Sequence, residues 1–198
     1  MLDKLYIQKF HADKIEKYGS ESAQSLAWFS ENDQIKRFEI LAQIGDLNNC
    51  SVLDIGCGNG DLCYYLSQHF ANVSYHGIDM IPAFLDNAIE KNKDFPSAAF
   101  YLGDFMQGNL PIADYILVSG SLNYKNSDQD FIFKAIAHLY AKCNKALGFN
   151  LLSKTVNRDG ILMAYAPKTI TDFCKTLSNT VVVKENYVEG DFSVMVYK

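Results

Sequence analysis

The sequence lacks the features of membrane, disulfide-bonded and nucleic-acid-binding proteins. Its five cysteines form no C-x-x-C pair and are odd in number, which predicts reduced thiols in a cytoplasmic protein. Residues 1–18 carry scattered charges and no unbroken apolar stretch, so neither a signal peptide nor a membrane span is expected. The net charge of −5, without a basic stripe interleaved with aromatic residues, makes nucleic acid an unlikely partner.

Metal-ligand clusters and internal repeats are also lacking. The four histidines are scattered and no carboxylates cluster, so no metal site is expected. His11 could act as a base, but a lone histidine usually has no catalytic role, and no catalytic residue is assigned. A chain of 198 residues without repeats is expected to fold around one hydrophobic core.

What the sequence does contain is the segment VLDIGCGNG at residues 52–60. The apolar run 51–55 is typical of a buried parallel strand. Glycines on alternate positions follow at once, where a ligand can approach the backbone closely. Residues 61–70 then place apolar side chains on one helical face. The segment predicts strand, glycine loop and helix, the nucleotide-binding corner of a doubly wound sheet.

The glycine spacing favours one adenosine cofactor over another. A dinucleotide fingerprint needs glycine or alanine three residues after Gly58, where this chain has Asp61, whose charge would repel a pyrophosphate. The order D-h-G-x-G-x-G beginning at Asp54 resembles motif I of the class I S-adenosylmethionine (SAM) dependent methyltransferases. SAM carries a sulfonium and an ammonium and no phosphate, so a loop bordered by two acids suits it. A dinucleotide-dependent oxidoreductase stays open as an alternative.

Two further acids follow apolar segments downstream. Asp79 closes a strand roughly twenty residues after the glycines, the spacing at which a carboxylate reaches an adenosine ribose. Asp104 lies in the run 99–105, read as a third strand ending in G-D-F. The resemblance implies that Asp104 takes the adenine amino group and that Phe105 supplies a backbone N–H or a wall to the ring. A single acid at a strand end is commonly a cap or turn residue, but three in order are hard to explain in that way.

The remaining pattern predicts the scaffold of an α/β protein. Alternating strands and helices continue to a terminal hairpin, whose last strand is expected at 192–197. The longest helix is expected at 128–145. The resemblance implies a Rossmann-like, doubly wound, seven-stranded sheet with an antiparallel last strand and an N-terminal helical cap. It divides the chain into a helical lid at 1–49, packed on the same domain, and a SAM-binding domain at 50–198.

The N-terminal residues resemble the head of a group of small bacterial methyltransferases, in the stretches Tyr18-Gly19, Ala27-Trp28-Phe29-Ser30 and Gln34-Ile-Lys-Arg37-Phe38. Ser30 is expected to cap a helix whose stripe of Ile35, Phe38, Leu41 and Ala42 docks on the sheet. Arg37 could pair with the methionine carboxylate of SAM, and Tyr18 or Trp28 could cover the sulfonium by a cation–π contact. The alternatives are a solvated charge for Arg37 and a core position for Trp28.

Together these patterns predict a SAM-binding site. Its expected members are Tyr18, Trp28, Arg37, Asp54, Gly56, Cys57, Gly58, Asn59, Asp79, Met80, Asp104, Phe105, Ser119 and Gly120. Ser119, Ser121, Asn123 and Tyr124 are candidates to line the acceptor pocket, because ligands bind at the carboxyl ends of parallel strands.

The sequence also excludes several classes of methyl acceptor. The N/D-P-P-Y motif of the N6-adenine and glutamine-amide enzymes and the Pro-Cys pair of the C5-cytosine enzymes are missing. Acids that would support metal-assisted catechol methylation are missing at the ends of the fourth and fifth strands. We therefore expect a SAM-dependent methyltransferase with a small-molecule acceptor. A protein or RNA methyltransferase and a non-catalytic SAM-binding protein remain alternatives, and the oligomeric state stays open.

Overall fold

A computed structural model describes residues 2–28, 30–154 and 160–198. Seven strands form one sheet in the order β3-β2-β1-β4-β5-β7-β6. β1 to β5 pair in parallel, and β7 is antiparallel to both β5 and β6. The predicted seven-stranded sheet with an antiparallel last strand is thereby confirmed. The strands are β1 (Ser51–Ile55), β2 (Ser74–Asp79), β3 (Ala98–Leu102), β4 (Ala113–Val118), β5 (Cys143–Leu152), β6 (Val181–Glu185) and β7 (Asp191–Tyr197).

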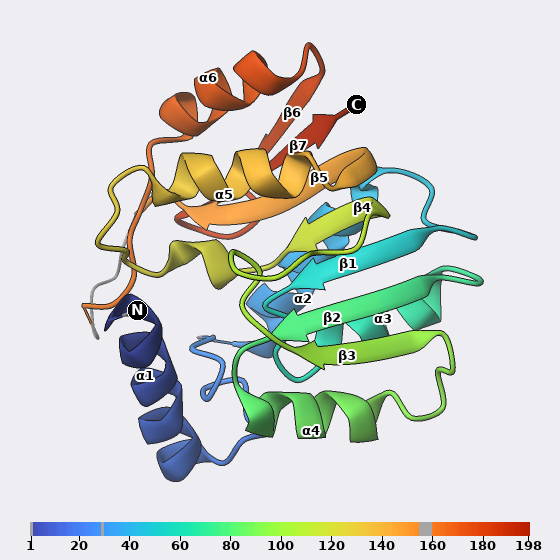
Figure 1. Cartoon of the computed structure of the whole chain (residues 1–198), viewed down its shortest axis with the longest axis vertical. Coiled ribbons are helices and arrows are strands. Elements are labelled where there is room, and N and C mark those ends of the chain that lie inside the picture. Colours follow the sequence, from blue (N-terminus) through green and yellow to red (C-terminus); the bar gives the residue numbers. More distant parts are fainter. Residues whose placement is uncertain (1, 29, 155–159) are drawn as a thin grey trace.

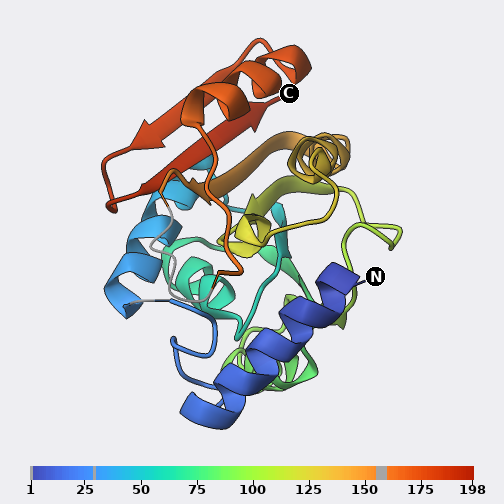
Figure 2. The same cartoon turned by 90° about the vertical axis from the view of Figure 1, so that its left-hand side faces the viewer.

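Helices cover both faces of the sheet, as Figures 1 and 2 show. Apolar side chains of α2 and α3 form a cluster against one face, and those of α5 and α6 form a second cluster. β4 lies between these clusters, which explains why its residues form a continuous apolar run. The helices are α1 (Leu2–Tyr18), α2 (Glu31–Leu41), η1 (Ala42–Ile44), α3 (Asp61–His69), α4 (Pro82–Lys91), η2 (Ser121–Asn123), α5 (Phe131–Tyr140) and α6 (Pro167–Leu177).

The order of the strands sets the position of the functional site. The chain leaves β1 toward β2 on one side and returns to β4 on the other, so the strand order reverses beside β1. Ligands of open α/β sheets bind outside the carboxyl ends of the strands at such a point. α1 lies alongside these ends of β1, β2 and β3 (Figure 1).

The N-terminal helices follow the expected pattern in part. The Ser30 side chain accepts a hydrogen bond from the Asp33 backbone N–H at 3.1 Å, which confirms the expected cap of α2. Phe38 and Leu41 are buried against the sheet, whereas Ile35 is 40% exposed and lies outside the docking stripe. Met1 and Phe29, which belong to the expected lid, lie outside the described residues.

The prediction of a helix over 128–145 is wrong at both ends. α5 begins at Phe131 and ends at Tyr140, and the Lys142 N–H then closes a turn on the Leu139 carbonyl at 2.9 Å. Cys143 continues the helical spacing of apolar residues, but it is the first residue of β5 and pairs with Ala113. Strand pairing therefore overrides the local periodicity at this position.

Candidate functional site

The glycine loop between β1 and α3 approaches the N-terminal segment closely. Gly56, Gly58 and Gly60 all have positive φ, which L-residues with a side chain rarely adopt. A Cβ atom at position 58 would lie 2.7 Å from Leu26 Cδ2. Glycine is therefore favoured at position 58 by its positive φ and by the nearby Leu26 side chain, whereas the sequence led us to expect the close approach of a ligand.

Asp79 holds this loop in place. Its carboxylate accepts hydrogen bonds from the backbone N–H groups of Gly58 and Ile81, each at 2.9 Å. Burial raises the pKa of Asp79, and the N–H groups oppose that shift. The carboxylate therefore orders the loop and also faces the cavity beside it.

Asp54 is fully buried beneath the same loop. One carboxylate oxygen, Oδ2, accepts a hydrogen bond from the Tyr75 hydroxyl, and Oδ1 has no partner among the described residues. Burial raises the pKa of Asp54 to about 7, with smaller contributions from the charges of Asp79 and Asp61, against the Tyr75 bond. Tyr75 was not singled out from the sequence, although a tyrosine inside a buried strand needs a hydrogen-bond partner.

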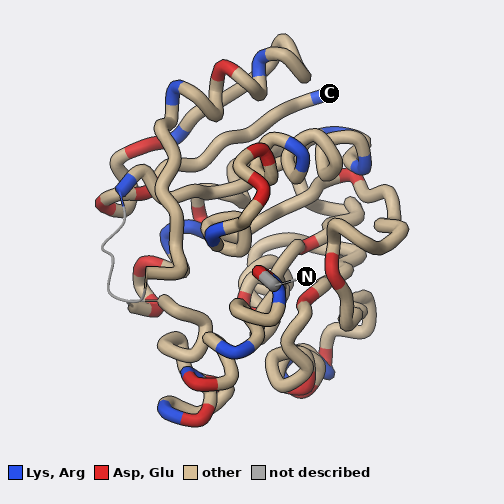
Figure 3. The backbone as a smooth tube through the Cα atoms, turned by 60° about the vertical axis from the view of Figure 1, so that its left-hand side comes forward, with Lys and Arg blue, Asp and Glu red and all other residues tan. Residues whose placement is uncertain are grey.

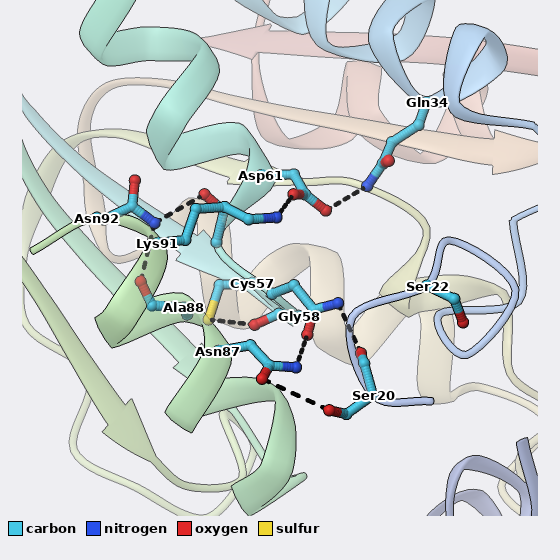
Figure 4. Close-up of polar contacts among 12 residues, drawn as sticks. Ser20, Ser22, Gln34, Cys57, Gly58, Asp61, Asn87, Ala88, Lys91 and Asn92 are labelled. Carbon is cyan, nitrogen blue, oxygen red and sulfur yellow. Dashed lines mark hydrogen bonds and ion pairs between the residues drawn. The ribbon is translucent and has the colours of Figure 1, made fainter. Parts of the chain in front are cut away.

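Asp61, at the start of α3, has a hydrogen-bond donor on one side and a countercharge on the other. Its Oδ2 accepts a hydrogen bond from Gln34 Nε2 at 3.1 Å, and its Oδ1 pairs with the Lys91 ammonium of α4 (Figure 4). The acid therefore joins α2, α3 and α4 at the rim of the cavity.

The third acid follows β3, which ends at Leu102, earlier than the expected strand end. Asp104 Oδ1 accepts a hydrogen bond from the Met106 N–H at 2.9 Å, and Oδ2 lies 3.7 Å from Lys4 Nζ of α1. Phe105 packs against the apolar cluster of α5 and α6. The Asp104 carboxylate therefore contacts both its own loop and α1.

Arg37 and Trp28 contact each other at the cavity wall. The Arg37 guanidinium carbon lies 4.6 Å from the Trp28 ring centroid, and Arg37 Nε pairs with Asp191 at the start of β7. The cation on the Trp28 ring is therefore Arg37, whereas the sequence led us to expect a sulfonium there. Tyr18 is 42% exposed and does not line the cavity, so the structure does not place it for the expected cover.

The segment after β4 crosses the site on its other side. Gly120 has φ +84°, and its N–H donates to Asn150 Oδ1 at 2.7 Å. A Cβ atom at position 120 would lie 2.6 Å from Trp28 Cη2. Asn150, on β5, was not expected in the site, because no local motif marks it.

The acceptor candidates of this segment have structural partners. Ser121 Oγ donates to the Ile55 carbonyl at 2.7 Å, and Asn123 Oδ1 accepts from the Leu152 N–H at 2.9 Å. The Tyr124 hydroxyl lies 2.7 Å from Nε2 of His11 on α1.

These elements enclose a cavity of about 410 Å³. The expected residues that line it are Trp28, Arg37, Asp54, Gly56, Cys57, Gly58, Asp79, Met80, Asp104, Phe105, Ser119 and Gly120. Asn59 does not line the cavity, because its side chain joins the Ser20 carbonyl to Asn87 Nδ2 at 2.9 and 3.1 Å. Within the described ranges, no group of three His, Cys, Asp or Glu side chains could hold a metal ion.

Comparison with known proteins decides the family. Residues 46–193 match the family model of a methyltransferase domain, which is most of the chain. The chain belongs to this family. It is a class I methyltransferase, the SAM-dependent class that motif I suggested.

Two curated relatives share less than a third of their aligned residues with this methyltransferase. A magnesium-protoporphyrin O-methyltransferase of Rhodobacter capsulatus is 29% identical over 124 residues, which are 61% of this chain and 51% of the relative. The match therefore spans about half of that relative. A putative methyltransferase of Mycobacterium tuberculosis is 27% identical over 158 residues, 75% of this chain and 93% of the relative.

Solved structures share the fold over nearly the whole chain. Magnesium protoporphyrin IX methyltransferase of Synechocystis, with bound S-adenosylhomocysteine (SAH), aligns with a TM-score of 0.73 at 16% identity and covers 99% of both chains. The N-methyltransferase NodS of Bradyrhizobium japonicum, also with SAH, aligns with a TM-score of 0.72 at 17% identity, over 96% of this chain and 97% of NodS. At these identities the likeness concerns the fold.

Proposed function

We propose that this methyltransferase transfers the methyl group of SAM to a small-molecule acceptor inside the cavity beneath α1. The supporting observation is the cavity itself, which brings three aspartates and two positive-φ glycine turns to the carboxyl ends of neighbouring strands. Its volume of about 410 Å³ lies within the range of roughly 300–1,000 Å³ common for small-molecule sites.

The amino-acid end of SAM fits polar atoms that lack partners among the described residues. Asp54 Oδ1 and Asp191 Oδ1 are buried acceptors, which suit an ammonium. Asn150 Nδ2 is a buried donor and Ser119 Oγ can donate as well, which suits a carboxylate. All four side chains line the cavity. A zwitterion would therefore satisfy both sets, in agreement with the requirement that buried polar groups be hydrogen-bonded.

The adenosine end fits the acids that close β2 and follow β3. Asp79 can accept hydrogen bonds from a ribose diol while it keeps its bonds to the loop, because a carboxylate has about four acceptor sites. Asp104 can accept a hydrogen bond from the adenine amino group, and Phe105 and Met80 offer apolar surface beside it. Asn59 acts from outside the cavity by holding the loop to residue 20.

The chain's part in methyl transfer is alignment. SAM supplies a methyl group already activated by a sulfonium, and an acceptor has to be held in line with it at about 3 Å. The lining by α1 and by residues 119–127 would orient the acceptor and exclude water. We propose that residues 1–49 are the lid that completes this enclosure.

The distribution of charge agrees with a small acceptor. Lys and Arg are interspersed with Asp and Glu along the chain in the view of Figure 3. Among the described residues, none of the helices combines the length and apolar character that a membrane crossing requires. The described cysteines are all free and buried, and on this basis we place the enzyme in the cytoplasm.

Labelled SAM and a metabolite extract test this proposal. The wild-type chain is expected to move label into the small-molecule fraction. Asp79→Ala removes charge-assisted hydrogen bonds worth about 1.5–3 kcal/mol each, so it should weaken SAH binding by one to several powers of ten in calorimetry. Asp86→Ala, an exposed acid on α4, is the matched control and should bind and transfer as the wild type does. Melting temperatures of both variants report whether the fold is kept.

Three outcomes contradict the proposal. Label confined to protein or RNA would assign a macromolecular acceptor. Tight SAH binding without label in any fraction would make the chain a non-catalytic binder. Binding of a nicotinamide dinucleotide in preference to SAH would overturn the cofactor.

A further inference from the structure

His11 and Tyr124 form a hydrogen-bonded pair in the cavity wall that the proposed binding of SAM does not use. His11 lies on α1 and is 5% exposed, and its Nδ1 is 2.8 Å from the Ser25 carbonyl oxygen. Its other nitrogen, Nε2, is 2.7 Å from the Tyr124 hydroxyl. The pair therefore joins α1, the segment before α2 and the segment after β4.

The Ser25 contact fixes the tautomer of His11. A carbonyl oxygen only accepts hydrogen bonds, so Nδ1 carries the proton. In the neutral imidazole the lone pair of Nε2 then faces Tyr124, whose O–H donates to it. The rings of Phe10 and Phe84 stand edge-on to His11, each with centroids 5.2 Å away. This environment presents a base that is aimed at a single hydroxyl group.

Burial, more than any neighbouring charge, favours the neutral form of His11. Burial lowers the pKa of His11, as does Lys14 on the same helix, while the Ser25 carbonyl opposes the shift. Burial raises the pKa of Tyr124, and Asp79 on β2 adds to this increase. The pair at neutral pH is therefore an unprotonated imidazole and a protonated phenol.

The backbone around Tyr124 is held on both sides. The Lys125 N–H donates to the Ile161 carbonyl at 2.8 Å, and the Met163 N–H donates to the Asn123 carbonyl at 2.7 Å. Tyr124 therefore has a fixed position at the cavity, as a group that handles a proton requires.

We propose that Tyr124 and His11 form a proton relay for a methyl acceptor that carries a hydroxyl group. This inference rests on the proposed methyl transfer and names its acceptor class. The acceptor O–H would donate to Tyr124 Oη, while the Tyr124 proton passes to His11 Nε2. The acceptor oxygen forms a bond to the methyl carbon, the carbon–sulfur bond breaks, and its electron pair stays on sulfur. The positive charge lost by sulfur reappears on the imidazolium, whose Nδ1–H remains bonded to Ser25.

The relay favours a hydroxyl acceptor over the other common classes. A carboxylate is already ionised at neutral pH, and an amine that has lost its ammonium proton to solvent before it binds attacks through its lone pair without a base. A hydroxyl keeps its proton until late in the reaction, so a positioned base accelerates its methylation. Tyr124 is then the catalytic residue, because it touches the acceptor, and His11 receives the proton through it.

Two variants test the relay. Tyr124→Phe removes only the hydroxyl, and His11→Gln keeps a polar side chain that takes no proton at neutral pH. Tyr64→Phe, on the exposed side of α3, is the matched control. Transfer from methyl-carbon-13 SAM to a metabolite extract should fall by about 100-fold or more in the two relay variants, the usual contribution of general base catalysis. Their SAH affinity and that of the control should stay close to wild type.

Other measurements separate a relay from a structural contact. The wild-type rate should fall as the pH drops through the pKa of His11, and the residual rate of His11→Gln should lack this step. Nitrogen-15 spectra of the free chain should show Nε2 of His11 unprotonated at neutral pH and shifted by Tyr124→Phe. The carbon-13 product should be an O-methyl ether that survives mild alkali.

Some results would overturn the relay alone. These are near wild-type transfer by both variants, an N-methyl or alkali-labile ester product, or spectra in which Nε2 carries the proton. A wild-type chain that transfers label to no fraction would overturn the proposed function as well, so the two failures are distinguishable.

Discussion

Arg37 of α2 and Asp191 of β7 form a buried ion pair although 154 residues separate them. The pair ties the N-terminal helices to the antiparallel end of the sheet, beside the cavity. Burial raises the pKa of Asp191, against the opposing effect of Arg37, so the carboxylate depends on its partner to remain charged. The guanidinium also lies over the Trp28 ring.

Removal of Arg37 should therefore destabilise the fold. Arg37→Met leaves the Asp191 carboxylate buried without its countercharge, and the free energy of unfolding should fall by about 3–5 kcal/mol. The loss should shrink as the pH falls, because protonated Asp191 needs no countercharge. Urea unfolding at several pH values measures this. Lys168→Met, which breaks an exposed pair with Asp172 on α6, should change stability little.

The raised pKa of Asp54 predicts opposite pH effects on binding and on stability. An ionised Asp54 attracts the ammonium of SAH, so below the pKa of about 7 affinity should weaken, approaching about tenfold per pH unit. The folded pKa lies above the unfolded value, so the free chain loses stability as the pH rises toward 7. Calorimetry and thermal melting across this range measure the two effects.

Asp54→Asn should remove the contribution of Asp54 to both pH dependences and stabilise the free chain above neutral pH, while it weakens SAH binding. Asp114→Asn is the control, because the Ser51 N–H lowers the pKa of Asp114 at the opposite end of the sheet. A wild-type affinity that does not change between mildly acidic and mildly alkaline pH would contradict the assignment of Asp54.

Because Gly120 lies close to the Trp28 ring, a methyl group added at position 120 should lower the free energy of unfolding. Gly120→Ala combines a positive φ with a Cβ atom 2.6 Å from the Trp28 ring. Gly19 has a similar φ of +81°, and a Cβ atom at that position would have no neighbour within 4 Å. The stability loss of Gly19→Ala should therefore reflect only the strained backbone conformation, about 1–2 kcal/mol. Gly120→Ala should lower the free energy of unfolding by more than Gly19→Ala does, and it should also weaken SAH binding.

Trp28 is the single tryptophan, so its fluorescence reports on this contact directly. Emission should change on addition of SAH and should differ between Gly120→Ala and wild type. Equal stability losses in the two glycine variants, with unchanged emission, would show that the ring is not held as described.

Local patterns account for the part of this site that the sequence predicted. Strand, glycine loop and helix adjoin each other in the chain, and Asp79 closes its strand directly, so spacing alone places them. Asp191 and Asn150 carry no such signal, because strand pairing far along the chain brings them to the cavity. Tyr18 was named from a local resemblance alone, and it is exposed and lies outside the lining of the cavity.

Asn59 links the segment before α2 to α4. Its Nδ2 donates to the Ser20 carbonyl and its Oδ1 accepts from Asn87 Nδ2. Asn87 Oδ1 in turn lies 3.5 Å from the Ser20 hydroxyl (Figure 4). Asn59→Ala leaves the partly buried Ser20 carbonyl and Asn87 amide without this partner, which should cost less than the roughly 1–3 kcal/mol of a fully buried group.

The effect should be local, because these bonds join the proposed lid to the glycine loop. Amide hydrogen exchange should accelerate in residues 19–28 of Asn59→Ala while β1 and β4 stay protected. Gln68→Ala, on the exposed side of α3, should leave exchange in 19–28 unchanged. Since Asn59 does not line the cavity, SAH should slow the exchange of 19–28 in the variant toward the wild-type rate. Uniform acceleration across the sheet would instead mean that Asn59 stabilises the whole fold and has no special connection to the lid.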